Sequence, residues 1–397
     1  MKSVFRTISL FFAVFSAVVF AADEAAGQDS RTIQEKATAE SLESIREDAG
    51  KGSREAQYAL ALHYEKDGDM TEAVKWYRKA AEQGDFESQY RLGVCYGKGE
   101  VVDPDPEEAF KWYLKAAEME FAKAQFPLGL CYENGSGVKR DVSEAVKWYR
   151  KRANHGDAEA QYRLGFCYEN YREVQSDDKA AIWYRRAAER GNAEAQYKLG
   201  CFYETGKGVE KSMIEAVGWY SKAAGQGVAE AQVKLGTIYE NGAKGIPQRK
   251  AAAVDWYRKA AEQGYGDAQF LYKLGTFYEE GNGVERKMSE AVKWYSKAAE
   301  QGYGDMQFLY KLGMFYYEGY GVKRNMSEAA KWYLKAAEQE KGYGIAELHY
   351  KIGTLYEEGK GVKKDRDEAV NWYRRALGNS TVDGKARQAL KRLGHEQ

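Results

Sequence analysis

Histidines, cysteines and clustered carboxylates are the side chains that most often catalyse reactions or bind metals. The four histidines, His63, His155, His349 and His395, fall far apart in the chain, and no two have the spacing of a metal-ligand pair. Relative to a recurring leucine, His63 holds the same position as Cys95, which is typical of a core residue. The carboxylates fall at helix starts and on polar faces, and no Gly-x-Ser-x-Gly motif is present. We therefore expect no catalytic residue, no metal site and no cofactor, and we do not expect an enzyme.

The sequence Gly-x-Gly-Val can form part of a phosphate-binding loop when it follows a strand and precedes a helix. Here it recurs between helical segments, beginning at Gly135, Gly206, Gly281, Gly319 and Gly359. Repetition at one place in a helical hairpin favours left-handed turn glycines followed by a buried valine. We therefore expect a structural turn at each copy and no bound phosphate.

Three of the four cysteines, Cys95, Cys131 and Cys167, share one position in a repeated unit, and Cys201 falls one position earlier. Helices pack ~8–10 Å apart, so equivalent helices of neighbouring hairpins should lie about twice that distance from one another. A disulfide requires Cα atoms within ~7 Å. We therefore expect four free thiols that pack as small apolar residues.

A Trp-Tyr pair recurs along the whole chain and sets the positions of these residues. Each of the nine tryptophans begins one copy of the pair, and successive tryptophans are 35 to 40 residues apart: Trp76, Trp112, Trp148, Trp183, Trp219, Trp256, Trp294, Trp332 and Trp372. Self-similarity at such a period is the signature of a solenoid built by stacking one supersecondary unit.

Two sequence patterns predict two helices in each unit. In the first, a leucine is followed by a tyrosine four residues later, as in Leu92 and Tyr96, and the intervening Gly93 indicates close helix approach. In the second, a capping residue such as Asp69 lies seven residues before the Trp and is followed by Glu72. The predicted fold is all-α, an α-solenoid of about nine helix–turn–helix repeats of 35–40 residues with capping helices.

The repeated motif resembles the Sel-one-like repeat, a branch of the tetratricopeptide-type helical repeats. Its parts are Ala-x-x-Gln-Tyr-x-Leu-Gly-x-x-Tyr in variants, Gly-x-Gly-Val, and Asp-x-x-Glu-Ala-x-x-Trp-Tyr-x-Lys-Ala-Ala, over about residues 53–378. The resemblance implies a right-handed superhelix whose concave surface binds proteins, as in an adaptor or scaffold. A cysteine-rich bacterial branch is associated with β-lactam binding, but its bridging positions here hold residues such as Ala81 and Gln89.

The chain divides into four predicted segments. Lys2 and Arg6 precede an apolar run at residues 8–20, so residues 1–21 are expected to be a cleaved signal peptide, with an uncleaved membrane anchor as the alternative. The other segments are a linker and N-terminal capping helix at 22–52, nine repeats at 53–378, and a C-terminal capping helix at 379–397. The mature protein is then secreted or periplasmic, or lies in the ER lumen of a eukaryotic host.

Composition narrows the range of partners. Sixty Lys and Arg residues balance sixty Asp and Glu residues, so the chain has no net field that would attract nucleic acid or an anionic membrane. After signal removal we expect no stable membrane insertion. The predicted function is a monomeric exported adaptor that binds another protein or peptide through its concave face or a junction-loop edge. The alternatives are a secreted β-lactam-like ligand binder or enzyme, and a secreted effector that acts on a host.

Aromatic residues outside the repeat pattern mark candidate binding positions. Of the 31 tyrosines, six have no place in the pattern, and five of these fall between residues 265 and 343, where the junctions between repeats are longer. Aromatic anchors at a turn are typical of protein-binding hot spots. The candidates are Tyr265, Tyr303, Tyr343, Tyr317, Tyr320, Phe270 and Phe308. The alternative is that the longer junctions bury these rings as a local plug.

The predicted first helices carry two further features. Glutamines recur at one position, where they either hold an extended peptide or bond to neighbouring backbone: Gln57, Gln89, Gln125, Gln161, Gln196 and Gln232. Pro127 falls inside one of these helices and is expected to shorten or kink it.

Overall fold

The computed structural model describes residues 41–99, 102–339, 346–378 and 381–395, which form helices joined by turns. Within those ranges the only extended pairing is an isolated bridge between Ala243 and Ile246. The predicted all-α solenoid of helix–turn–helix repeats is therefore confirmed. The predicted signal peptide and Tyr343 lie outside the described residues. None of the described helices combines the length and the apolar character that crossing a membrane requires.

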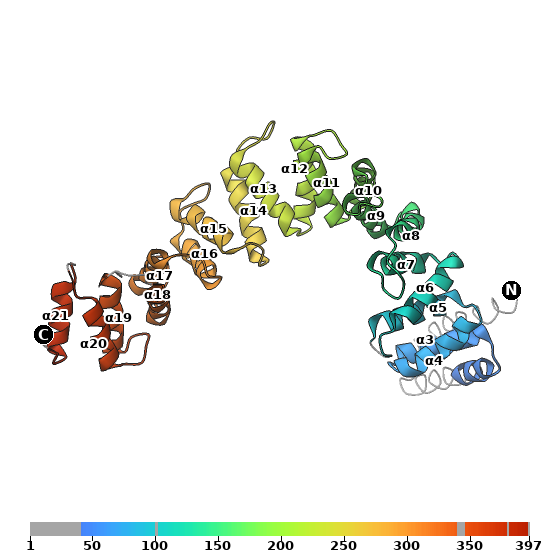
Figure 1. Ribbon diagram of the computed structural model, residues 1–397, viewed down its shortest axis with the longest axis horizontal. Helices are drawn as coiled ribbons and strands as arrows, with labels where there is room; N and C mark the ends of the chain where they lie inside the picture. The colour runs from blue at the N-terminus through green and yellow to red at the C-terminus, as the bar shows by residue number, and fades with distance from the viewer. Residues whose placement is uncertain (1–40, 100–101, 340–345, 379–380, 396–397) are drawn as a thin grey trace, which may run out of the picture. The chain divides into compact units, whose positions relative to one another are not determined.

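The chain forms two compact units, Met1–Ala187 and Ala188–Gln397, and each contains a row of helical hairpins (Figure 1). In the first unit, residues 41–50 are helical. They precede α3 (Arg54–Lys66), α4 (Met70–Glu82), α5 (Phe86–Lys98), α6 (Pro106–Glu118), α7 (Ala122–Asn134), α8 (Val142–Asn154), α9 (Ala158–Asn170) and α10 (Asp177–Glu189), which ends just past the unit boundary.

The second unit continues the same alternation of first and second helices. Its elements are α11 (Ala193–Thr205), α12 (Met213–Gly225), α13 (Ala229–Asn241), α14 (Lys250–Glu262), α15 (Ala268–Glu280), α16 (Met288–Glu300), α17 (Met306–Glu318), α18 (Met326–Glu338), α19 (Ala346–Glu358), α20 (Arg366–Arg375) and α21 (Asp383–Arg392). Odd-numbered helices from α3 to α19 are the first helices of the repeats, and each forms a hairpin with the helix that follows it.

Capping residues start the second helices where the sequence predicts. The side chain of Asp69 accepts a hydrogen bond from the backbone N–H of Glu72 at 3.0 Å, and α4 begins one residue after Asp69. Asp105 accepts the same bond from Glu108 at 3.0 Å, and Pro106 occupies the first position of α6, where no backbone donor is needed. These caps satisfy backbone groups that the helix itself leaves unpaired.

Glycines allow the hairpins to close and to stack. A Cβ atom at Gly93 of α5 would fall 2.5 Å from Cε1 of Tyr113, so this ring of α6 lies directly on the backbone of α5. In the α7–α8 turn, Gly137 has a φ of +72°, and a Cβ atom there would fall 1.9 Å from the carbonyl oxygen of Pro106 in the preceding repeat. The glycines of Gly-x-Gly-Val are therefore left-handed turn residues, as predicted, and the turn also contacts the preceding repeat, but its valine is half-buried and not buried as expected.

The Trp-Tyr pairs form much of the core. The tyrosine after each Trp is buried, whereas the tryptophans range from half-buried Trp76 to fully buried Trp294. A Lys or Arg three residues after each Trp covers the indole face, and the Nζ of Lys79 lies 3.8 Å from the Trp76 ring centroid. These long side chains keep their charge in water while their stems shield apolar surface.

The expectation that Pro127 shortens its helix is wrong. α7 has thirteen residues, as α5 and α9 do, and Pro127 is its sixth residue. The proline removes one backbone bond, to the carbonyl of Lys123. Burial of Ala124 and Leu128 on either side holds the helix in place, because tertiary packing supplies most helical stability.

Candidate functional site

Paired tyrosine rings recur along the first and second helices. The tyrosine two residues before the first-helix leucine packs against the tyrosine that follows the Trp, as in Tyr58 and Tyr77, whose ring centroids are 6.1 Å apart. In the last repeat the same pairing joins Tyr350 and Tyr373 at 5.5 Å. Because the second ring of each pair is buried, its hydroxyl requires a hydrogen-bond partner.

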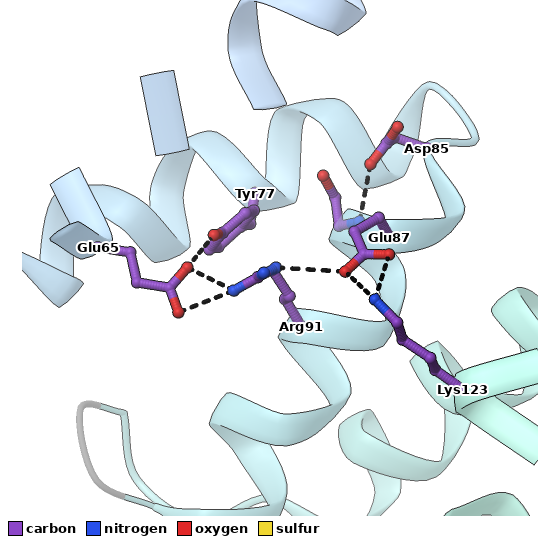
Figure 2. A network of polar contacts seen from close by, with 7 residues as sticks. Glu65, Tyr77, Asp85, Glu87, Arg91 and Lys123 are labelled. Atoms are coloured by element: carbon purple, nitrogen blue, oxygen red, sulfur yellow. Dashed lines mark hydrogen bonds and ion pairs between the residues drawn. The ribbon is translucent and has the colours of Figure 1, made fainter. Parts of the chain in front are cut away.

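A glutamate at the end of the first helix accepts that bond and also contacts the next repeat (Figure 2). Glu65 of α3 accepts hydrogen bonds from the hydroxyl of Tyr77 and from Nη1 of Arg91, the latter at 2.8 Å. Arg91 lies on α5, the first helix of the next repeat. We call a Tyr and a Glu of one repeat with a Lys or Arg of the next a Tyr–Glu–cation bridge. It joins consecutive hairpins through charge-assisted hydrogen bonds.

The second and third repeats are joined in a different way (Figure 2). Glu87 of α5 lies 3.7 Å from Nε of Arg91 and 3.1 Å from Nζ of Lys123 on α7. Gly97 replaces the glutamate of the usual bridge, and Pro127 replaces its cation. Because both partners are replaced together, neither charge of the bridge is left without its partner at this interface.

Four complete bridges recur among the described residues of the second unit. In these bridges the nitrogen of the cation lies 2.6 to 2.9 Å from a carboxylate oxygen: Tyr220–Glu204–Lys234, Tyr257–Glu240–Lys273, Tyr295–Glu279–Lys311 and Tyr373–Glu357–Arg392. Burial raises the pKa of Glu279, but the hydrogen bonds from Lys311 and Tyr295 outweigh it and lower that pKa overall. Arg392 belongs to α21, so this helix supplies the cation that a first helix supplies in the other bridges.

Between the eighth and ninth repeats the cation of the bridge is kept but the carboxylate is not. Tyr317 stands at the glutamate position of α17, and the buried hydroxyl of Tyr333 has no hydrogen-bond partner among the described residues. Lys351 is retained, and its Nζ lies 4.5 Å from the Tyr317 ring centroid. Its ion pair with Glu318 is long, at 3.9 Å. Tyr317, one of the candidate binding residues, is therefore half-buried against Lys351.

Five of the six recurring glutamines donate a hydrogen bond to backbone among the described residues: Gln57, Gln89, Gln161, Gln196 and Gln232. Nε2 of Gln89 donates to the carbonyl of Ala81 at 3.0 Å, and Gln161 donates to Ala153 at 2.9 Å, in each case to the preceding second helix. All six glutamines are at most 5% exposed. Their amides therefore hold consecutive repeats together, and they are not free to bind an extended peptide.

The α14–α15 and α16–α17 junctions are two residues longer than the α8–α9 junction, and bulkier side chains enter the interface there. At the position of the buried Ala160 in α9, the later helices carry Phe270 and Phe308. Phe270 packs edge-on against Tyr257, with ring centroids 5.5 Å apart, and Phe308 packs in the same way against Tyr295 at 5.5 Å. These two candidates are half-buried and pack against the core.

Tyr265 and Tyr303 hold the same place in the longer junctions but differ in their surroundings. The half-buried ring of Tyr303 stacks on Tyr272, with centroids 4.5 Å apart. One repeat earlier, the residue equivalent to Tyr272 is Val233, which offers no ring for stacking. The side chain of Tyr265 is accordingly 37% exposed.

Tyr320 is also exposed, at 49%, but it lies in the α17–α18 turn. Its ring stacks on Phe315 with centroids 5.9 Å apart, and its hydroxyl accepts a 3.4 Å hydrogen bond from Nη2 of Arg286 in the preceding turn. A turn and a junction are at opposite ends of the helices, so the structure does not bring Tyr320 together with Tyr265.

The predicted candidate residues do not include an apolar patch in the first unit. Phe86 is 46% exposed and Met119 is 65% exposed, and Phe121 lies half-buried beside Phe86. Six of the other repeats carry alanine at the position of Phe86, and five carry glutamine at the position of Met119, as Gln83 does in the first repeat. These departures from the repeat pattern are the sequence signal that marks the patch.

Stacked helical hairpins with paired tyrosines and bridges between repeats define a helical repeat protein of the tetratricopeptide-like class. The chain belongs to the Sel1 repeat family, as its motif suggested. The family model matches residues 54–85, 86–121, 122–157, 158–192, 193–228, 229–265, 268–303, 307–341 and 346–377.

Two solved structures illustrate the similarity. A Sel1 repeat protein from Oxalobacter formigenes is 35% identical over 61% of this chain and 99% of its own, with a TM-score of 0.50. A protective antigen of uropathogenic Escherichia coli is 28% identical over 89% of this chain and 93% of its own, with a TM-score of 0.41. No curated protein matches the chain significantly.

Proposed function

We propose that the chain is an exported adaptor that binds another protein through the junction edge of its second unit. The junction edge consists of Tyr265 and Tyr303 with Phe270 and Phe308, at the α14–α15 and α16–α17 junctions. Sel1 repeat proteins generally mediate protein–protein interaction, which supports the adaptor class. Export rests on the apolar run that follows Lys2 and Arg6.

The exposure of Tyr265 is the observation that carries this proposal. Tyr303, Phe270 and Phe308 each have an aromatic partner within the array, at centroid distances of 4.5 to 5.5 Å. Val233 provides no aromatic ring for Tyr265 to stack on, and the ring of Tyr265 therefore remains at the surface. Rigid aromatic rings at a surface supply much contact area at low entropic cost, as binding hot spots do.

Affinity capture tests the proposed edge. Residues 22–397 are immobilised as wild type and as Tyr265→Ser, and each is exposed to proteins of the periplasm or medium of the source cells. Ile214→Ser is the matched control, because Ile214 is an apolar residue of the same unit that is 63% exposed. A protein retained by wild type and by Ile214→Ser but lost with Tyr265→Ser supports the edge. Equal retention by all three chains contradicts it.

Export is tested separately from binding. A fusion of residues 1–40 to a reporter that is active only outside the cytosol should give signal, and N-terminal sequencing of the mature protein should find a start near Ala22. Substitution of Leu10 and Val14 by Asp should abolish the signal, because a charged core cannot act as the apolar region of a signal peptide. A cytosolic reporter with an intact N-terminus would contradict export.

A further inference from the structure

The α6–α7 junction departs from the other junctions at three consecutive residues. The α4–α5 junction reads Gln83, Gly84 and Asp85, whereas the α6–α7 junction reads Met119-Glu120-Phe121. In the α4–α5 junction the glutamine donates a hydrogen bond, the glycine has positive φ, and the aspartate caps the next helix.

Glu120 holds a backbone conformation that suits glycine. Its φ is +58°, and it is the only residue other than glycine with positive φ in the part of the chain that the structure describes. At the equivalent place Gly84 has a φ of +86°, and Gly156 has a φ of +85°. A side chain in this left-handed region is disfavoured by contact between Cβ and backbone. Strain of this kind persists where the surrounding structure enforces it, often at functional sites.

Two polar contacts are also lost at this junction. The side chain of Asp85 accepts a 2.7 Å hydrogen bond from the N–H of Ser88 and caps α5 (Figure 2), whereas Phe121 provides no side-chain cap for α7. Nε2 of Gln83 donates to Oε1 of Gln57 at 2.8 Å. Because Met119 replaces this donor one repeat later, the buried Oε1 of Gln89 has no partner among the described atoms.

In place of these contacts the junction presents an apolar patch, which we define as Phe86, Met119 and Phe121. The Phe121 ring lies 5.0 Å from Phe86 and 5.8 Å from Tyr90, measured between centroids. Phe86 and Met119 remain largely exposed. An aromatic and thioether surface of this kind adapts well to an apolar side chain of a partner.

The charges next to the patch indicate the chemistry of its occupant. Glu82, Glu118 and Glu120 are exposed, and none makes an ion pair within the described ranges. Nζ of Lys123 lies 5.6 Å from the Phe121 ring centroid, but its charge is already paired with Glu87 at 3.1 Å. An acidic rim around an apolar centre is complementary to an apolar anchor flanked by basic residues.

We infer that the Phe86–Met119–Phe121 patch is a second docking site, which binds a segment of a partner protein that carries an apolar side chain next to Lys or Arg. Three features that stabilise the α4–α5 junction are absent here, and an exposed anchor surface with an acidic rim replaces them. The site lies in the first unit and does not depend on the junction edge of the second.

Selection from random peptides tests the inference. Phage-displayed peptides of about twelve residues are panned on residues 22–397 and, in parallel, on M119Q/E120G/F121D, which restores the Gln-Gly-Asp sequence. We expect wild type to enrich peptides that place an apolar residue beside Lys or Arg. A synthetic copy of such a peptide should bind the triple variant and Phe86→Ala about tenfold or more weakly than wild type, as expected on loss of a hot spot.

Two controls keep the test decisive. Ile182→Gln removes an apolar residue of the first unit that is 51% exposed outside the patch, and it should leave the affinity unchanged. The triple variant should melt at a higher temperature than wild type, because it relieves the strained backbone and restores the cap, so weaker binding cannot be attributed to unfolding. Equal binding by the triple variant, enrichment of acidic or wholly polar peptides, or a lower melting temperature of the triple variant would each overturn the inference.

Discussion

The ammonium group of Lys351 lies over the ring of Tyr317, 4.5 Å from its centroid, where the preceding repeat pairs Lys311 with Glu279 at 2.7 Å. The segments around Glu279 and Tyr317 are close copies, so the replacement can be compared directly. A cation–π contact has taken the place of an ion pair, and the hydroxyl of Tyr333 has lost its acceptor.

Tyr317→Glu should restore the Tyr–Glu–cation bridge. In wild type, Lys351→Met should remove about 0.5–1 kcal/mol of cation–π attraction from the free energy of unfolding. In the Tyr317→Glu background the same change should cost about 1.5–3 kcal/mol, because it removes a hydrogen bond to a charged group. A double-mutant cycle from urea denaturation measures the difference, and Lys311→Met provides the reference value in an intact bridge. Equal costs in both backgrounds would show that the bridge does not re-form.

Three aromatic residues of the second unit should rank by burial. Trp294→Ala should cost about 3–5 kcal/mol, because its side chain is fully buried. Tyr303→Ala should cost about 0.5–1.5 kcal/mol through the lost stack on Tyr272, and Tyr265→Ala should stay within about 0.5 kcal/mol. Hydrogen exchange of α16 and α17 measures these costs locally, which matters because long repeat arrays unfold in several steps. If Tyr303→Ala matched Trp294→Ala, the ring at 303 would belong to the core and not to a binding edge.

The Tyr–Glu–cation bridges predict a loss of stability in acid. The folded-state pKa of Glu279 is lowered, so its contribution is fully present above the ordinary pKa of about 4.3 and is lost as pH falls through the folded value. Glu279→Gln should therefore cost about 1–3 kcal/mol near pH 7 and much less near pH 3. Chemical denaturation of both proteins at about pH 7, 5 and 3 measures this difference. A cost that does not change with pH would contradict a role for the carboxylate charge.

The cysteines should differ in reactivity. Cys95, Cys131 and Cys167 are buried free thiols, and burial raises the pKa of Cys131 to about 11. Cys201 is partly exposed and its sulfur accepts a hydrogen bond from Tyr220 at 3.3 Å. In the native protein one thiol, Cys201, should react with a thiol reagent near pH 8, and the other three should react only as fast as the repeats open. Cys201→Ser should abolish the fast phase, and a second fast thiol in that variant would contradict the burial.

Two glycines separate turn strain from contact between repeats. Gly137 and Gly68 both have positive φ, but only Gly137 would direct a Cβ atom into the preceding repeat. Gly68→Ala should cost about 1 kcal/mol through backbone strain, and Gly137→Ala should cost clearly more. The urea midpoints of the two variants give the comparison. Equal midpoints would mean that the contact of this turn with the preceding repeat does not affect stability.

The sequence was sufficient for features that depend on neighbours along the chain. Asp69 and Asp105 mark helix starts because a cap contacts backbone only two or three residues away. The stacking order follows from the period of the Trp-Tyr pair, and the free thiols follow from helix spacing. Each of these arguments uses a short-range rule applied at a repeated position.

Features that depend on residues about 30 positions apart could not be read in this way. Tyr265 and Tyr303 have the same local sequence, and their different exposure follows from Val233 and Tyr272 in the repeats before them. At Glu120 the sequence shows that glutamate replaces a junction glycine, but only the structure shows that the backbone keeps the positive φ. The predicted binding residues therefore include both exposed and half-buried rings, because the exposure of each ring depends on the adjacent repeat.

The bridges also affect how such an array can change in length. A typical repeat brings a carboxylate for the repeat that follows it and a cation for the repeat before it, as Glu279 and Lys273 do in the seventh repeat. Duplication or deletion of a whole repeat therefore adds or removes one carboxylate and one cation together. The array can grow or shrink by complete units without leaving a charge of a bridge unpaired, whereas a break inside a unit would separate a carboxylate from its cation.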